Sequence, residues 1–274
     1  MLEHYGDKAA IYAGGTELLL IMKEGLVHYP HLVNIKTIPR LDLIRLAPNA
    51  QTLLIGALAT HRHLEQDPMV NQHAAMLSES SAQVGNLRVR TTGTIGGNLC
   101  FAEPHSDPAT VLLAYGATLE LSGVNGVRKV PIDEFVCGLF ETTRQPDEIL
   151  TAINVPALPQ ESGSAYVKFS IHERPTATVA VILYLKDGLI EKAQLSLGSV
   201  GPTPVRLTKA EEVLQGFAPD SSLFAEAAAY AQESTDAVDD IYGSAAYKAH
   251  LATILTKRAL ELAAQRADGA TFDN

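Results

Sequence analysis

The sequence predicts an α+β protein, and three observations lead to that class. First, an apolar run at 8–13 reaches a diglycine and then a helical pattern, which is typical of a small α/β segment. Second, the region 48–158 mixes helical stretches with a hairpin pattern. Third, the last third reads as three strands followed by helices. The expected domains are therefore 1–47, 48–158 and 159–274.

The first domain should hold one strand–helix–strand unit that ends near Pro39. Thr16 is suited to cap the helix, and Gly25 is suited to end it, because glycine adopts the left-handed conformation readily. The expected elements are a strand at 8–13, a helix at 16–25 and a strand at 31–35.

The middle domain contains one helix whose start is well specified. Asp107 is placed to cap it, Pro108 fits the first helical position, and Gly116 should stop it. The domain begins at the apolar run 52–60, and a linker starts at Pro156. The other expected elements are helices at 61–67 and 76–84, a hairpin of 117–123 with 126–132, and a closing strand at 148–156.

The last domain should be a three-stranded sheet with trailing helices. Asp187-Gly188 supplies the hairpin turn between the second and third strands. The expected strands lie at 164–172, 177–188 and 189–201, and the expected helices at 206–216, 222–234 and 247–265. The final helix should turn one apolar stripe toward the core, made of Tyr247, Leu251, Ile254, Leu255 and Leu262.

Charge and cysteine content exclude several classes of function. The formal net charge is −10, which argues against nucleic acid or an anionic membrane as the main partner. The chain has two cysteines, so it holds no disulfide framework and no zinc or iron–sulfur ligand set. Neither a signal-peptide pattern nor a membrane-length apolar run is present. We therefore expect a cytoplasmic protein without a membrane span.

The two diglycines, Gly14-Gly15 and Gly96-Gly97, are the motifs that carry chemistry. A glycine turn before a helix leaves unpaired N–H groups and lets a phosphate approach without meeting a Cβ atom. For either pair alone, an ordinary turn is the better interpretation. Neither fits the Rossmann or P-loop pattern, so the residues alone support only a nucleotide or phosphate ligand in general terms.

Other polar residues give weaker signals. His61 and His63 have a spacing that can hold metal on a strand, but no cysteine or carboxylate cluster joins them, so a surface position at a helix start is expected. His105 and Ser106 are adjacent, and neighbours rarely present a base and a nucleophile to one substrate.

The stretch "KFSIHER" places three polar side chains on one expected strand face. Lys168, Ser170 and His172 alternate there, with Arg174 just beyond. A lone lysine on a strand is usually a solvated surface residue.

Five segments together are more specific than any of them alone. "YAGGTELLLIMKEG", "VRTTGTIGGNLCFAEPHSDP", "DEILTAINVP", "LSLGSVGPTPVRLTKAEEVLQG" and "YKAHLATILTKRALELA" occur in this order between about residues 5 and 265. The chain thus resembles the FAD-binding (medium) subunit of the molybdenum hydroxylases, as in carbon monoxide dehydrogenase, and the flavin domain of xanthine dehydrogenase. The resemblance implies a PCMH-like FAD-binding fold in the first two domains and a C-terminal flavoprotein domain.

The resemblance also implies which residues meet FAD. The two glycine segments, 13–18 and 94–98, would cradle its pyrophosphate. Leu150 would lie beside the flavin, and Lys168 would stabilise negative charge on the reduced flavin. An unchanged flavin potential in Lys168→Ala would remove that last role. The implied cofactor-binding residues are Ala13, Gly14, Gly15, Thr16, Glu17, Leu18, Thr94, Ile95, Gly96, Gly97, Asn98, Ser106, Asp107, Leu150 and Lys168. No catalytic acid or base and no metal ligand is implied.

This chain departs from the family pattern at two places. Relatives usually carry a strand and a helix before the first glycine segment, and here the sequence starts at the end of that helix. Either the start is misplaced, the chain is trimmed or a partner covers the gap, and we expect an effect on the stability of the first domain more than on FAD binding. Some relatives have an aromatic residue where this chain has Val84, so we expect different support for the flavin or adenine on that side.

The function implied by the resemblance is electron transfer. In such complexes a large subunit holds the molybdenum cofactor and a small subunit holds two [2Fe–2S] clusters, in a dimer of heterotrimers. This chain would pass electrons from those clusters through FAD to an external acceptor. The alternatives are a flavin-free scaffold subunit, a stand-alone FAD oxidoreductase and, more distantly, a phosphate-binding protein. Intact glycine segments count against a scaffold, and the lack of an acid–base set counts against a stand-alone enzyme.

Overall fold

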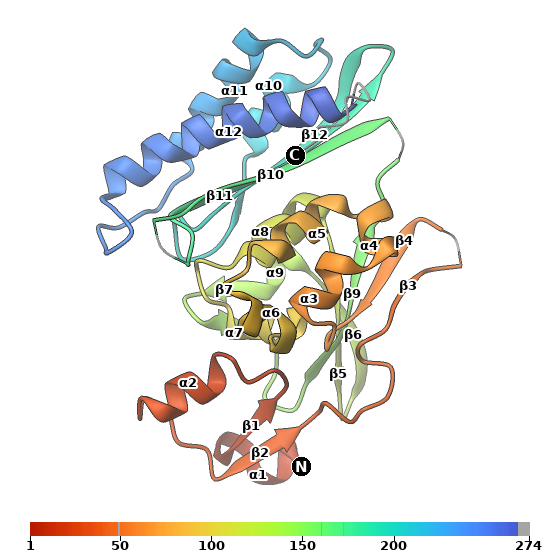
Figure 1. The fold of residues 1–274 in the computed structure, drawn as a ribbon, viewed down its shortest axis with the longest axis vertical. Coiled ribbons are helices and arrows are strands. Elements are labelled where there is room, and N and C mark those ends of the chain that lie inside the picture. Colours follow the sequence, from red (N-terminus) through yellow and green to blue (C-terminus); the bar gives the residue numbers. More distant parts are fainter. Residues whose placement is uncertain (49, 160, 172, 268–274) are drawn as a thin grey trace.

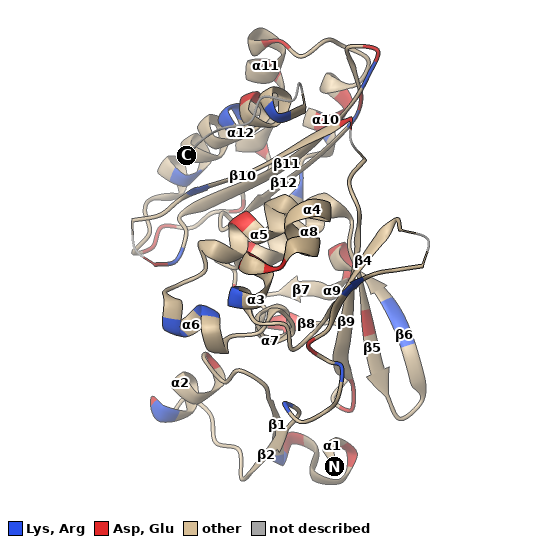
Figure 2. Ribbon diagram, turned by 45° about the vertical axis from the view of Figure 1, so that its right-hand side comes forward, with Lys and Arg blue, Asp and Glu red and all other residues tan. Residues whose placement is uncertain are grey.

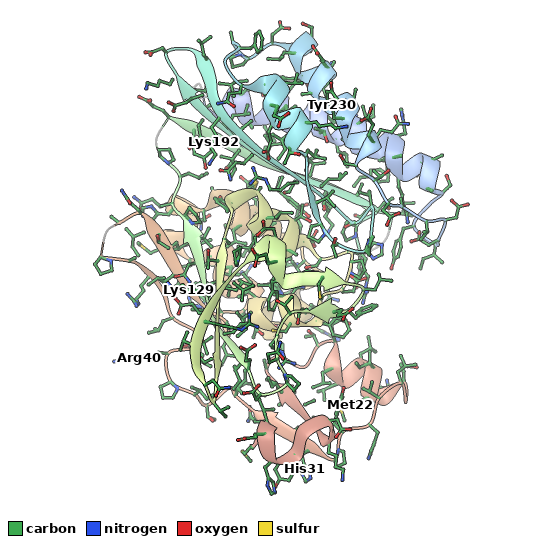
Figure 3. All side chains as sticks on the ribbon, turned by 180° about the vertical axis from the view of Figure 1, so that it is seen from behind. Met22, His31, Arg40, Lys129, Lys192 and Tyr230 are labelled. Atoms are coloured by element: carbon green, nitrogen blue, oxygen red, sulfur yellow. The ribbon has the colours of Figure 1, made fainter. Side chains whose placement is uncertain are left out.

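The computed structural model describes residues 1–267 apart from 49, 160 and 172, and it stacks three layers of structure along its long axis (Figure 1). The first layer is a two-stranded sheet, the second a five-stranded sheet with helices, and the third a four-stranded sheet with helices. From behind, Met22 and His31 lie at one end of the molecule and Tyr230 lies at the other (Figure 3). The mixture of helices and antiparallel sheets confirms the α+β class.

The N-terminal layer is the expected strand–helix–strand unit. Its two strands pair in parallel, with Ala9 opposite His31. Its elements are α1 (Leu2–Tyr5), a 3₁₀ turn (Gly6–Lys8), β1 (Ala9–Tyr12), α2 (Leu18–Lys23) and β2 (His31–Asn34). Gly25 ends the helix at φ +74°, as predicted. The prediction for Thr16 is wrong, because the helix starts at Leu18 with Glu17 in the N-cap position and no side-chain cap.

The middle layer contains a five-stranded antiparallel sheet in the order β3-β4-β9-β5-β6. The closing strand of this region, β9, is therefore its central strand, inserted between two strands that precede it in the chain. The strands are β3 (Ile44–Leu46), β4 (Thr52–Gly56), β5 (Thr118–Gly123), β6 (Gly126–Pro131) and β9 (Ile149–Pro156), with a separate hairpin of β7 (Val136–Gly138) and β8 (Glu141–Thr142). The predicted hairpin at 117–132 is confirmed as β5–β6.

Short helices complete this layer. They are α3 (His61–Gln66), α4 (Pro68–His73), α5 (Ala75–Ala82), α6 (Leu87–Thr92), α7 (Ile95–Phe101), α8 (Asp107–Tyr115) and α9 (Ile132–Phe135). Helices α4, α7, α8 and α9 contact the strands of the sheet. Two expectations were wrong here. The second diglycine lies in the first turn of α7 rather than in an open turn. Helix α8 has Ser106 in the N-cap position, and Asp107 is its first residue, because the Asp107 carboxylate is engaged elsewhere in the interior.

The C-terminal layer is a four-stranded antiparallel sheet in the order β10-β11-β12-β13. Its elements are β10 (Ser162–Phe169), β11 (Ala177–Lys186), β12 (Leu189–Gly198), β13 (Val205–Arg206), α10 (Thr208–Leu214), α11 (Ser221–Glu233) and α12 (Ala245–Ala267). The two-residue strand β13 was not predicted. Asp187 and Gly188 form the predicted hairpin turn, both at positive φ.

Strand β11 contributes side chains to two hydrophobic cores, one on each face of the C-terminal sheet. Val179 and Val181 pack with α10–α12, whereas Ala180 and Ile182 pack into the middle core. Because side chains alternate between the faces of a strand, a strand covered on both sides reads as one continuous apolar run.

The apolar stripe predicted for α12 is only partly correct. Leu251 and Leu255 are buried, but Tyr247 and Ile254 are exposed and Leu262 is half-buried. The buried face consists of Lys248, Leu251, Ala252, Leu255, Thr256, Ala259, Leu260, Ala263 and Ala264. Small residues mark this face because the sheet approaches closely, so that a Cβ atom on Gly163 would overlap the Ala263 carbonyl oxygen. In the described part of the chain, no helix has both the length and the apolar character needed to cross a bilayer.

Candidate functional site

The two glycine segments lie against each other, although about eighty residues separate them. A Cβ atom built on Gly14 would overlap the Thr92 carbonyl oxygen and lie 2.9 Å from the Gly93 Cα. A Cβ atom on Gly93 would in turn lie 3.4 Å from the Thr16 Oγ1. Gly14 is therefore needed because the backbone of the first glycine segment touches the backbone of Thr92 and Gly93, which directly precede the second segment.

The first segment offers a row of unused backbone donors. Within the described structure, the N–H groups of residues 14–18 donate no hydrogen bond, although all five residues are half-buried. The backbone turns sharply at Gly15, whose φ of +77° favours glycine. Successive unpaired N–H groups form a concave, electropositive surface that suits an anion.

The second segment is organised differently, because its first donors are already used. The Ile95 N–H bonds to the Ala59 carbonyl at 3.0 Å and the Gly96 N–H bonds to the Ala57 carbonyl at 2.9 Å. The Thr94 hydroxyl accepts the Gly97 N–H at 3.1 Å and so caps α7.

Gly96 and Gly97 therefore have different roles. A Cβ atom on Gly96 would lie 2.6 Å from the Ala57 Cβ, so this glycine allows α7 to pack on the end of β4. Gly97 is exposed, and a Cβ atom there would meet only the Thr94 Oγ1, at 2.8 Å. Only Gly97 presents bare backbone at the surface, where a ligand can approach it.

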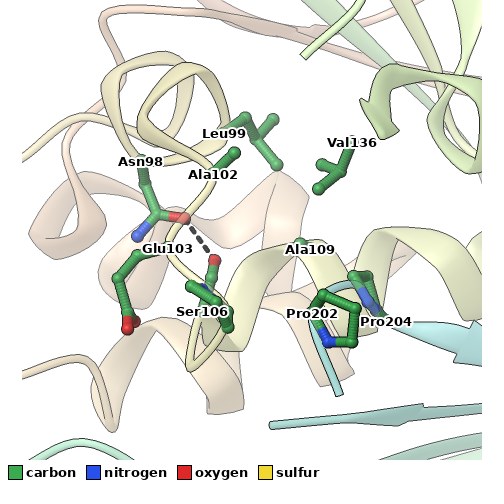
Figure 4. A pocket seen from close by; sticks show the side chains of 10 residues that line it. Asn98, Leu99, Ala102, Glu103, Ser106, Ala109, Val136, Pro202 and Pro204 are labelled. Carbon is green, nitrogen blue, oxygen red and sulfur yellow. Dashed lines mark hydrogen bonds between the residues drawn. The ribbon is translucent and has the colours of Figure 1, made fainter. Parts of the chain in front are cut away.

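A chain of polar contacts continues from α7 into the interior. Ser106 Oγ donates to Asn98 Oδ1 at 2.6 Å (Figure 4). The next residue, Asp107, accepts from Lys168 Nζ at 3.0 Å and from the Tyr166 hydroxyl. Lys168 also donates to the Gln83 carbonyl at 2.9 Å.

The Asp107–Lys168 pair is buried, which corrects the expectation of a solvated lysine. The two side chains are 5% and 6% exposed. Burial raises the pKa of Asp107, and the charge of Lys168 together with the hydrogen bond from Tyr166 opposes that shift. Burial and the neighbouring Asp107 carboxylate hold the pKa of Tyr166 well above its usual value. The pair fixes β10 against the start of α8.

A small cavity of about 10 Å³ lies beside the Asn98–Ser106 bond, lined also by Leu99, Val136 and Pro202 (Figure 4). That volume accommodates roughly one water molecule, far less than the several hundred Å³ of a typical cofactor site. A cofactor bound by the glycine segments would lie outside this cavity.

An ion-pair cluster that no sequence pattern revealed connects the first glycine segment to Glu103, two residues after α7. Arg174, in the loop between β10 and β11, lies 2.8 Å from Glu103 Oε1 and 3.4 Å from Glu17 Oε2. His105 donates its backbone N–H to Glu103 and places its Nδ1 2.9 Å from Glu103 Oε1. Glu17 and Arg174 are 157 positions apart in the chain, so no local pattern could have revealed the pair.

The remaining predicted residues take structural positions. Ile95 is fully buried in the middle core, as is Leu150, which pairs with Leu121 of β5. Ala13 is half-buried directly after β1, and Val84 is buried, its carbonyl oxygen accepting a hydrogen bond from Arg90.

Two other motifs do not form catalytic sets. Ser106 bonds to Asn98 and His105 bonds to Glu103, so they are not a nucleophile–base pair, as expected. Ser170 is exposed beyond the end of β10 rather than on its face, and His172 falls outside the described residues. Among the described residues, no three His, Cys, Asp or Glu side chains gather in a way that could hold a metal ion.

Basic side chains next to the glycine segments come from α6, which lies between α3 and α2 in Figures 1 and 2. Arg88 is exposed, whereas Arg90 is bonded to Glu65 at 3.2 Å. The positive charge of Arg88 thus remains available at this surface of an otherwise acidic protein.

His61 was expected at the surface but is buried at the start of α3, with 2% exposure. In the described structure its Nδ1 has no hydrogen-bond partner. Burial and, to a smaller extent, the charge of Arg90 lower the pKa of His61 from 6.5 to about 4. His63, by contrast, is 45% exposed and lies 3.5 Å from Asp67.

This shift predicts acid sensitivity. Because the folded-state pKa of His61 is depressed, the stability that depends on its neutral ring is fully present above pH 6.5 and is lost as the pH falls toward 4. The free energy of unfolding should fall by roughly 1.4 kcal/mol per pH unit within that window, or about 3 kcal/mol in total. Urea titrations at several pH values should show that the free energy of unfolding of the wild type falls more steeply toward pH 4 than that of His61→Leu. Parallel profiles would contradict the assignment.

Comparisons with known families cover nearly the whole chain. Residues 1–158 match the family described as "FAD binding domain in molybdopterin dehydrogenase". Residues 167–263 match the family described as "CO dehydrogenase flavoprotein C-terminal domain".

Individual relatives agree with this assignment. The chain is 33% identical over 269 residues to the carbon monoxide dehydrogenase medium chain of Afipia carboxidovorans, covering 97% of this chain and 93% of the relative. It is 30% identical over 272 residues to the xanthine dehydrogenase FAD-binding subunit of Escherichia coli O157:H7, covering 96% and 91%. The structure of carbon monoxide dehydrogenase from Hydrogenophaga pseudoflava superimposes with a TM-score of 0.94 at 33% identity, covering 97% of this chain and 92% of that one. This chain therefore belongs to the FAD-binding subunits of the molybdenum hydroxylases, the oxidoreductase family that includes carbon monoxide dehydrogenase and xanthine dehydrogenase.

Proposed function

We propose that this chain is the electron-transfer subunit of a molybdenum hydroxylase complex. FAD held by the two glycine segments supplies redox chemistry that links [2Fe–2S] clusters on a small partner subunit to an external acceptor. The molybdenum cofactor belongs to a large partner subunit, and the complex is a dimer of heterotrimers in the cytoplasm. The medium chains and named subunits among the relatives support an assembly of this kind.

The observation that carries the proposal is the contact between the two glycine segments. The row of unused N–H groups at 14–18 fits an anionic pyrophosphate, and Gly97 leaves the adjoining surface free of a side chain. The close approach of Gly14 to Thr92 and Gly93 holds the two surfaces side by side. The residues present therefore fit FAD.

The other implied residues would position the cofactor rather than react with it. Asn98 and Ser106 are fixed by their mutual hydrogen bond, and Asp107 and Lys168 by their ion pair. Because these side chains are already fixed before binding, less conformational entropy is lost when a ligand binds to their remaining polar atoms. Lys168 Nζ, 3.0 Å from Asp107 Oδ2, would be held close to the bound cofactor by this pair.

The absorption spectrum of the purified chain tests cofactor binding. We expect flavin bands and about one FAD per chain after denaturation, as one intact site requires. Gly97→Leu should lose the flavin, because the added side chain occupies the ligand-facing surface, and the Thr94 cap must shift because the new Cβ would lie 2.8 Å from its Oγ1. The unfolding midpoint of the flavin-free variant separates the two effects. A wild-type chain that remains colourless after incubation with FAD would contradict the proposal and favour a scaffold subunit.

Metal analysis of the native complex tests the electron-transfer role. Material purified through this chain should contain about four iron atoms and about one molybdenum atom per FAD, as two [2Fe–2S] clusters and one molybdenum cofactor require. Flavin without iron or molybdenum would favour a stand-alone FAD oxidoreductase.

A further inference from the structure

Arg174 joins the C-terminal layer to the first glycine segment and to the loop that follows α7. Among the described ion pairs, it alone contacts a carboxylate in the first segment, Glu17, and a carboxylate just after α7, Glu103. The three side chains are distant in sequence: Glu17 directly precedes α2, Glu103 follows α7 by two residues, and Arg174 follows β10 by five residues. Their meeting point is therefore set by the fold.

Glu17 raises an electrostatic problem for the site. Its carboxylate belongs to the same stretch, 14–18, whose free N–H groups suit a pyrophosphate. A pyrophosphate is anionic, and a nearby carboxylate repels it by an amount that depends on local screening. In the described structure Arg174 is the only ion-pair partner of Glu17.

The Arg174 guanidinium is held in place from several sides. Glu103 is 12% exposed and is itself fixed by two hydrogen bonds from His105. The His105 ring packs on the Tyr242 ring, with 4.4 Å between the ring centroids. The residue before Arg174, Glu173, accepts a hydrogen bond from Asn86 at 3.2 Å. Burial opposes ionisation of Glu103, but its hydrogen bonds with His105 and the charge of Arg174 outweigh burial and lower its pKa.

We propose that Arg174 is a positioning residue for FAD: it neutralises Glu17 and ties the first glycine segment to Glu103, so that the pyrophosphate meets the free N–H row without an unbalanced negative charge. This inference rests on the FAD site proposed above. Arg174 acts through Glu17, and its own contact with the phosphates is not required.

Titration of the flavin-free full-length chain with FAD tests the inference. Arg174→Gln should raise the Kd about ten-fold, because one compensating charge is lost in a partly screened site. Adding Glu17→Gln to that variant should restore the Kd to within about three-fold of the wild type, since the repelling charge is then gone. Arg258→Gln, on the exposed face of α12, serves as the matched control and should bind FAD like the wild type.

The unfolding midpoint of each flavin-free variant separates loss of binding from loss of structure. An unchanged Kd in Arg174→Gln would overturn the inference. A double variant as weak as Arg174→Gln alone would also overturn it, and would indicate that Arg174 contacts the phosphates directly. Failure of the wild type to bind FAD would overturn the proposed function together with this inference, whereas the two outcomes above overturn the inference alone.

Discussion

Gly14→Ala is expected to lose FAD and to destabilise the protein. The new Cβ atom would overlap the Thr92 carbonyl oxygen and crowd the Gly93 Cα at 2.9 Å, and both are main-chain atoms that cannot rotate away. The two segments must separate, at a cost of roughly 3 kcal/mol in the free energy of unfolding, in the range of severe overpacking. Bound FAD should fall below about one tenth of the wild-type content, since 1.4 kcal/mol already changes an equilibrium ten-fold.

Gly201→Ala is the matched control for this substitution. The nearest atom to a Cβ at Gly201 is the Asp236 Cβ, at an ordinary contact distance of 3.5 Å. Urea unfolding and FAD content should therefore both stay near wild-type values. If Gly14→Ala behaved like this control, the two glycine segments would not be in the close contact described above.

Asp107→Ala is expected to produce the largest loss of stability. It removes the carboxylate that pairs with Lys168 and leaves an ammonium group on a side chain that is 6% exposed, together with a Tyr166 hydroxyl that has lost an acceptor. Removing one partner of a buried pair costs about 3–5 kcal/mol, because the remaining charge has no compensation. The measurement is urea unfolding of the flavin-free chain, so that any role of Asp107 in cofactor binding does not enter.

Two comparisons sharpen this test. Glu233→Ala breaks an exposed pair with Lys209 and should leave the free energy of unfolding within error. Lys168→Met combined with Asp107→Ala removes both charges and should recover much of the loss, as expected when an ion pair is replaced by apolar groups. A loss below about 1 kcal/mol in Asp107→Ala would show that Lys168 finds other compensation.

Local sequence determined many of the elements of this protein. The hairpin turn at Asp187-Gly188 and the helix stop at Gly25 depend on backbone conformations that few residues adopt, so their positions could be predicted without knowledge of the fold. The apolar runs located the longer strands, and the glycine segments with their surrounding motifs identified the family. These signals act over a few residues, and the chain carries them in any context.

Tertiary structure decided what those elements do. The Lys168 side chain is buried because Asp107 lies opposite it in space, although a lysine on a strand is ordinarily solvated. Gly96 allows α7 to pack against Ala57, whereas Gly97 leaves backbone exposed at the surface, although the two residues form one motif in the sequence. Arg174 reaches Glu17 across 157 positions, a contact that only the stacking of the three layers creates. Burial, charge pairing and close backbone contact all depend on neighbours that are distant in the chain, and their energies therefore enter only when the chain has folded.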